Sequence, residues 1–310
     1  MKTACALAML GSLGLLLSYS TVRSADQTVS PDPKLLSRHY RDGEKPSYHM
    51  TATNKDRTRT TSYEARADGI VKKNTTGDFY EEYQWSNLLV NGHALAIPSA
   101  NAGFHQMLSL DPRFPAAFPD LRQAYPPLIA PMLDFMTFYV DLGLAIRQNG
   151  LDHPNDHVYI KVGKPNSWAA GYNLLLGEDS IDFDITLQSV DRSAGIATLL
   201  VRHVPPARPQ IHLPVAWMQK PVADTPNNWV EVGKNADGAY TASVGKETFD
   251  DVIKLNLTDG RILSATMDNP VEVLERKCID AALTSCSDPI RYQIRRQIEI
   301  TENAGDGKLN

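Results

Sequence analysis

A long apolar segment, Leu128–Ile146, constrains the fold of this chain more than any other feature. Its hydrophobic residues recur every three or four positions, which is the spacing of an α-helix, and they cover almost the whole circumference. Pro126 and Pro127 precede the segment and Gly150 follows it, as expected for the start and the end of a helix. A helix that is apolar nearly all round has to be buried, so we predict a central helix over about residues 127–149.

The same segment is close to the length of a membrane span, which needs about 20 apolar residues. Asp134 and Asp141 lie inside it, and an ionised Asp near the centre of a bilayer costs about 2.5–3.5 kcal/mol. We therefore expect a helix in the core of a folded domain, and not an integral membrane protein.

The N-terminus has the three parts of a secretory signal peptide: Lys2, the apolar run Ala6–Leu17, and small residues before Ala25. We predict a signal peptide at residues 1–24 and export to the periplasm or out of the cell. Cys5 precedes the apolar run, so it is not placed to carry a lipid anchor.

Charge and motifs exclude several function classes. Without the predicted signal peptide, which holds Lys2 and Arg23 and no acidic residue, the formal net charge changes from −5 to −7. The chain has no basic run, so we expect no nucleic-acid partner. It also lacks the G-x-S-x-G, H-E-x-x-H and Gly-rich phosphate-loop motifs, so we predict no cofactor and no catalytic residue. The oligomeric state stays open.

Short segments of alternating hydrophobic and polar residues on both sides of the helix indicate β-strands. They do not alternate with helices, and no Ser/Gly linker divides residues 25–310. The pattern predicts a single α+β domain in which a large curved antiparallel sheet wraps around one long central apolar helix. The predicted strands include Ser47–Thr53, Thr60–Ala67, Gly69–Lys73, Ala94–Ile97, Phe104–Leu110, His157–Val162, Ile181–Ser189, Ile196–His203, Trp229–Val232, Ala239–Val244 and Ile290–Ile300.

One hairpin allows a prediction of register. A three-residue turn, Thr258-Asp259-Gly260 with Gly260 left-handed, places Ile253 opposite Ala265 and Leu255 opposite Leu263. A two-residue loop would instead set apolar residues against polar ones, so we predict the three-residue turn.

A cation falls on an apolar face in the last strand, where Arg296 alternates in step with Ile294 and Ile298. An unpaired buried charge is very costly, so Arg296 needs an acidic partner or access to water at the rim of the sheet. The central helix offers two partners, and we predict a buried ion pair with Asp134 or Asp141.

Two cysteines follow the predicted signal peptide, Cys278 and Cys286. An even number in an exported chain favours a disulfide over a metal pair. A different metal site is suggested by His153, Asp156 and His157, which bring imidazole and carboxylate ligands into one short loop. Pro154 and Asn155 indicate a turn at this point, and in that alternative Asp156 bonds the local backbone.

The predicted architecture, strands curled around an apolar helix in an exported chain, is similar to the half-barrels of periplasmic lipoprotein carriers and related lipid-binding envelope proteins. Tyr63–Leu88 and Asp288–Ile300 also resemble secreted bacterial proteins of unknown function. The first resemblance implies an apolar or lipid-like ligand held between sheet and helix. Aromatic and apolar residues of these elements are the candidate ligand-binding residues: Tyr83, Trp85, Phe135, Met136 and Tyr139.

The sequence therefore favours an exported, non-enzymatic binding protein. Two alternatives remain, an envelope structural or interaction protein with a filled core, and a hydrolase with a site near the His153–His157 loop.

Overall fold

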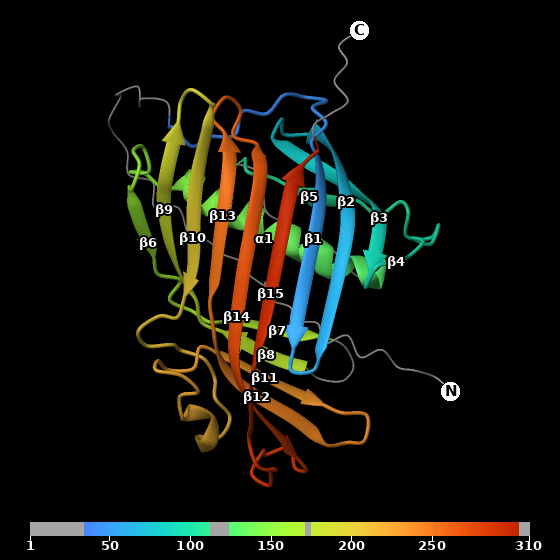
Figure 1. The fold of residues 1–310 in the computed structure, drawn as a ribbon, viewed down its shortest axis with the longest axis vertical. Coiled ribbons are helices and arrows are strands. Elements are labelled where there is room, and N and C mark those ends of the chain that lie inside the picture. Colours follow the sequence, from blue (N-terminus) through green and yellow to red (C-terminus); the bar gives the residue numbers. More distant parts are fainter. Residues whose placement is uncertain (1–33, 112–123, 171–174, 304–310) are drawn as a thin grey trace.

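The computed structural model describes residues 34–111, 124–170 and 175–303, so the predicted signal peptide lies outside the described residues. The predicted fold class is confirmed. The described chain forms a large, open, antiparallel sheet of 15 strands with one long helix (Figure 1). The strands are β1 (Ser47–Asp56), β2 (Arg59–Lys73), β3 (Phe79–Val90), β4 (His93–Ala94), β5 (Gln106–Leu108), β6 (His157–Ile160), β7 (Asn166–Ala170), β8 (Leu175–Asp179), β9 (Asp182–Asp191), β10 (Ile196–Val204), β11 (Trp229–Lys234), β12 (Tyr240–Glu247), β13 (Phe249–Asn256), β14 (Ile262–Cys278) and β15 (Ile290–Glu302).

The helix α1 spans Ile129–Arg147 and is preceded by the 3-10 turn η2, Pro126–Leu128. This confirms the helix predicted over residues 127–149. Among the described residues, η2 and α1 together are the one helical stretch whose length and composition would suffice to cross a membrane. Most of it is buried inside the fold, because α1 lies diagonally against the curved sheet (Figure 1).

The long strands β14 and β15, which pair with each other, join two parts of the sheet. In the larger part, the strands β4-β3-β2-β1-β15-β14-β13-β10-β9-β6 follow one another and curve around α1. In the smaller part, the far half of β14 turns to pair with β12, and the sheet continues through β11 and β8 to β7 (Figure 1). The change of partner falls at Pro270, where β14 leaves β13 and begins to pair with β12. A proline lacks an amide donor, so this position suits the break in pairing.

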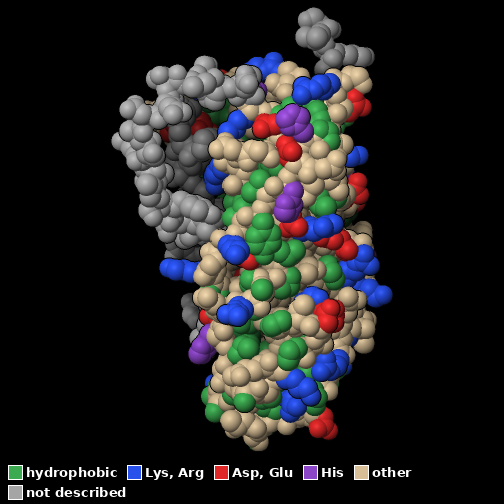
Figure 2. Space-filling view, turned by 90° about the vertical axis from the view of Figure 1, so that its left-hand side faces the viewer, with side chains coloured by type: hydrophobic (Ala, Val, Ile, Leu, Met, Phe, Trp, Pro, Cys, Tyr) green, Lys and Arg blue, Asp and Glu red, His purple; other side chains and the backbone are tan. Residues whose placement is uncertain are grey.

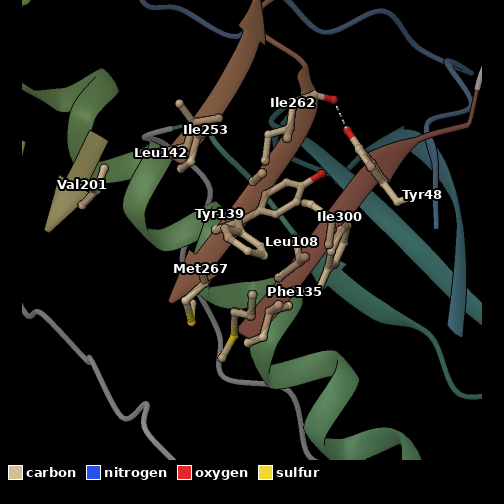
Figure 3. Close-up of a cluster of buried hydrophobic side chains, with 14 of the residues drawn as sticks. Tyr48, Leu108, Phe135, Tyr139, Leu142, Val201, Ile253, Ile262, Met267 and Ile300 are labelled. Atoms are coloured by element: carbon tan, nitrogen blue, oxygen red, sulfur yellow. Dashed lines mark hydrogen bonds between the residues drawn. The ribbon is translucent and has the colours of Figure 1, made fainter. Parts of the chain in front are cut away.

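The main core lies between α1 and the concave face of the larger part. Phe135, Phe138 and Leu142 are completely buried on the helix. Side chains from strands far apart in sequence meet them, among them Val201, Ile253, Ile262, Met267 and Ile300 (Figure 3). The Tyr48 hydroxyl donates to the Ile262 carbonyl at 3.0 Å inside this core (Figure 3). The interior along the helix is therefore filled by side chains.

Thr60–Ala67 and Gly69–Lys73 are predicted as two separate strands with a break at Asp68-Gly69, and that prediction is wrong. Both residues lie within the single strand β2. A Cβ atom on Gly69 would come 2.5 Å from the Tyr83 ring, so the glycine serves close packing of a neighbouring aromatic side chain.

The β13–β14 hairpin differs from its prediction in loop length. Its connection comprises residues 257–261, because β13 ends at Asn256 and β14 begins at Ile262, and the Asn256 amide donates across it to the Arg261 carbonyl at 2.9 Å. Gly260 is left-handed as predicted, with a φ of 70°. Ile253 faces Ala265 as predicted, but a shift after Lys254 places Leu255 opposite Ile262.

The sulfur atoms of Cys278 and Cys286 lie at disulfide distance, 2.08 Å. They close the end of the β14–β15 hairpin, next to a small hydrophobic cluster in the smaller part of the sheet. Large exposed hydrophobic residues are few in the described chain: Met107, Tyr159, Ile279 and Ile290. On the face shown in Figure 2, hydrophobic side chains form small groups separated by polar and charged surface.

The smaller part of the sheet contains a carboxyl group that we expect to make stability depend on pH. Burial, reinforced by the charge of Glu275, raises the pKa of Glu231 from 4.5 to about 7. The folded state holds this proton more tightly than the unfolded chain, so the stability it contributes is lost as pH rises from about 4.5 to about 7. Urea unfolding at about pH 5 and about pH 7.5 should show a steeper loss for the wild type than for Glu231→Gln. The exposed Glu272→Gln variant is the control, and an equal flattening in both variants would contradict the assignment.

Candidate functional site

A cavity of about 640 Å³ opens at the end of the curved sheet where α1 begins. Its wall consists of β3, β4, the loop that follows β4, and the residues around η2. The apolar part of the lining includes Trp85, Leu88, Leu95, Ile97, Phe104 and Leu128. Glu64, Gln84 and Asn101 add polar groups. An apolar cavity with a few polar groups is the usual form of a small-molecule site.

The five predicted ligand-binding residues do not all reach this cavity. Trp85 lines it, and its indole nitrogen donates to Gln106 Oε1 at 3.0 Å. Phe135, Tyr83 and Tyr139 instead pack against one another, with ring centroids 5.0–6.2 Å apart, and Met136 is also buried. These four residues do not line the cavity. The physical reason is that the large side chains of α1 fill the space between helix and sheet.

A buried polar network connects β3 to the helix and to the segment before β1. Glu81 Oε2 accepts hydrogen bonds from the hydroxyls of Tyr83, at 2.6 Å, and Tyr139. Glu81 Oε1 accepts from Arg38 Nε at 3.2 Å and from Nη2 at 3.1 Å. Burial, then the charge of Glu81, raises the pKa of both tyrosines well above its usual value, so they remain donors. This network is closed by its own partners and offers no group to a ligand.

Arg296 contacts Asp134, one of its two predicted partners. Arg296 Nη2 donates to Asp134 Oδ1, and the Tyr63 hydroxyl donates to Oδ2 at 2.5 Å. Asp141, the other predicted partner, lies elsewhere along the helix and contacts a histidine. The ion pair has a structural explanation, since it neutralises two charges in the core.

Asp141 belongs to a second buried cluster, with His203 of β10 and Asp251 of β13. His203 Nε2 lies 2.8 Å and 2.9 Å from the two carboxylate oxygens of Asp141. Burial raises the pKa of Asp141 to about 7, and burial together with the charge of Asp141 raises that of Asp251 well above its usual value. Burial also lowers the pKa of His203. All three groups are thus driven toward their neutral forms unless a cation joins them.

The metal site predicted at His153, Asp156 and His157 does not assemble. Asp156 Oδ2 accepts from the backbone amides of Asp152, at 2.8 Å, and His153, at 2.6 Å. His157 Nε2 faces Asp184 at 2.6 Å. Within the described chain, the group whose ligand atoms all approach within 4.8 Å is instead Asp141, His203 and Asp251. The alternative, a turn in which Asp156 bonds the local backbone, is the one observed, because the amides of this loop donate to the Asp156 carboxylate.

The sequence analysis selected neither Asp251 nor Glu81 as a candidate site residue. Both show the pattern that identified Arg296, which is an ionisable residue that alternates in step with the apolar residues of a strand. Asp251 alternates with Phe249 and Ile253, and Glu81 alternates with Phe79 and Tyr83. Applied to every strand, that rule would have found both residues.

Comparison with known proteins adds no assignment. No family model, no curated protein and no solved structure matches this chain.

Proposed function

We propose that this protein is a non-enzymatic binding protein for an apolar or lipid-like small molecule, held in the cavity at the start of α1. The observation that carries the proposal is the 640 Å³ cavity between β3, β4 and η2. Its volume lies in the range of about 300–1,000 Å³ typical of small-molecule sites. This location differs from the one expected from the sequence, since the middle of the helix is packed against the sheet.

The lining supports an apolar ligand with a polar end. Trp85, Phe104 and Leu128 supply hydrophobic surface, while Glu64 and Gln84 add hydrogen-bonding groups. The Trp85 indole is held by Gln106, which in turn donates to the Met132 carbonyl of α1 at 2.8 Å. One wall of the cavity is thereby fixed to the helix. Such preorganisation reduces the entropy lost when a ligand binds.

A structural or interaction protein is the second candidate, favoured by the filled interior along α1, where Phe135, Phe138 and Leu142 are completely buried. Export, which the signal-peptide prediction implies, is part of both proposals. Among the described residues that line the cavity, Glu64 is the one ionisable carboxylate and no His or Cys stands beside it, so this lining gives catalysis less support than binding.

The test is binding of the apolar fluorophore N-phenylnaphthylamine to protein purified without detergent, before and after extraction with organic solvent. We expect saturable binding and an apolar molecule in the extract of the untreated protein. Ala94→Phe places a ring at the cavity wall on β4, where the backbone is fixed opposite Leu89. We expect it to weaken binding at least about tenfold, which is ~1.4 kcal/mol.

The matched control is Ala282→Phe, which adds the same exposed ring in the loop closed by the disulfide. This variant should bind N-phenylnaphthylamine as the wild type does, and the melting temperatures of both variants should lie within a few degrees of the wild-type value. Absence of saturable binding, or equal affinity in Ala94→Phe and the wild type, would favour the structural role.

A further inference from the structure

Three elements that are distant in sequence bring two carboxylates and an imidazole together inside the core. Asp141 lies on α1, His203 on β10 and Asp251 on β13. Asp141 and Asp251 are 0% exposed and His203 is 3% exposed. Ligand atoms from all three lie within 4.8 Å of one another.

The Asp251 side chain provides the second observation. Neither of its carboxylate oxygens accepts a hydrogen bond from an N–H donor or a hydroxyl group, although both are buried, and the neighbour within hydrogen-bonding reach is the second acid, Asp141. In the part of the chain that the structure describes, no Lys or Arg lies within ion-pair distance of Asp141 or Asp251. A buried carboxylate without a donor or a cation is very costly. One carboxylate oxygen of Asp251 is directed at the other two groups, since it belongs to the set of atoms within 4.8 Å.

We propose that Asp141, His203 and Asp251 bind one divalent first-row transition metal ion of the Zn²⁺ type. Two carboxylates and one imidazole form a mixed oxygen and nitrogen donor set, which suits Zn²⁺. Two negative charges would balance the charge of the ion, which removes the conflict between two adjacent buried acids. In tetrahedral geometry, bonds of about 2.0–2.1 Å place neighbouring ligand atoms about 3.3 Å apart. His203 Nε2 lies at hydrogen-bond distance from the Asp141 oxygens, 2.8 Å and 2.9 Å, so these atoms need to separate by only about 0.5 Å to admit the ion.

The surroundings hold the imidazole in place. The His203 ring packs between Phe183 and Phe249, with centroids 4.5 Å and 4.7 Å away. Leu142 follows Asp141 in the chain, and Val201 lies opposite Asp251 in the β10–β13 pair. Leu142 and Val201 belong to the apolar core (Figure 3). All three side chains are shielded from solvent, so the ion has a structural role and exchanges only when the core opens. This inference does not depend on the proposed cavity function, because the cavity lies at the other end of α1.

The experiment uses the full chain, unfolded in urea with a chelator and refolded with or without Zn²⁺. After gel filtration, elemental analysis should find one Zn²⁺ per chain, retained during dialysis against the chelator, and the melting temperature should rise. Asp251→Asn keeps the shape of the side chain and removes its charge. We expect this variant to bind Zn²⁺ at least about tenfold more weakly, since even outer partners of a metal site contribute that much.

Two controls separate this site from other acids and histidines. Glu247→Gln changes a buried acid of β12 that does not belong to the cluster. The double variant His153→Ala/His157→Ala removes the exposed histidines of the loop before β6. Both should keep one tightly bound Zn²⁺ per chain.

If Asp251→Asn does not fold, His203→Gln and the visible absorption of bound Co²⁺ provide a second test. A coordinated imidazole in a low-coordinate site should give an intense absorption that His203→Gln loses. The proposal is overturned if refolded wild type holds no Zn²⁺, if Asp251→Asn binds as tightly as the wild type, or if the metal is lost with His153 and His157.

Discussion

Replacing Arg296 with methionine should lower the free energy of unfolding by about 3–5 kcal/mol, because it leaves a carboxylate buried without its cation. Arg296 and Asp134 are 8% and 5% exposed. The Tyr63 hydroxyl remains as a donor to Asp134 in the variant, but it carries no charge. Urea unfolding should therefore show a lower midpoint, with a slope unchanged from the wild type.

The neighbouring residue provides the matched control for this prediction. Arg295 lies on the opposite face of β15 and forms two hydrogen bonds with Asp268, with half of its side chain exposed. Arg295→Met should cost less than about 1 kcal/mol, as exposed ion pairs do. Arg296→Met combined with Asp134→Leu should regain most of the loss, since no buried charge is left unpaired. Equal losses in Arg295→Met and Arg296→Met would contradict the assigned role.

Glu81→Gln should destabilise the fold by a similar amount, about 3–5 kcal/mol. Glu81 is 1% exposed, and its two oxygens accept from different partners. A glutamine has one acceptor oxygen, so its amide group must face either Arg38 or the hydroxyls of Tyr83 and Tyr139. Whichever partner is lost, a buried donor remains unsatisfied. The measurement is again the midpoint of urea unfolding.

Glu82→Gln is the control, since Glu82 follows Glu81 on β3 and lies on the opposite face. It pairs with Lys72, whose side chain is 41% exposed. We expect a change below about 1 kcal/mol. A larger loss in Glu82→Gln than in Glu81→Gln would show that the buried network contributes little to stability.

Much of the fold could be predicted from the sequence because hydrophobic periodicity determines which face of each element is buried. The helix is an example, since an all-round apolar segment with two acids predicted burial and a contact of Arg296 with Asp134 or Asp141, and Asp134 is the partner in the structure. The strands β7 and β8 were missed because they have short or Gly-containing patterns. The loop before β14 was predicted too short, and local pattern also does not reveal that Gly260 packs against the backbone of Ser37, which is far away in the sequence.

The candidate sites were less predictable, since each requires residues that only the tertiary structure brings together. The cavity depends on how the loop after β4 stands relative to η2, and no local pattern encodes that distance. The Asp141, His203 and Asp251 cluster depends on β10 pairing with β13. The local His153–His157 pattern predicted a metal site that does not form. The Asp156 carboxylate accepts from the His153 backbone amide, and the His157 imidazole contacts Asp184.

The helix also faces a problem of position that its hydrophobic surface does not solve. An apolar cylinder on an apolar sheet has many placements of similar energy, related by a slide of one turn, about 5.4 Å, or by a rotation about its axis. Asp134, Tyr139 and Asp141 contact groups on β15, β3 and β10, respectively. Sliding or rotating α1 would leave all three buried without partners, so these contacts fix both the axial and the rotational register of the helix. These polar contacts thus determine a single placement of the helix in the core.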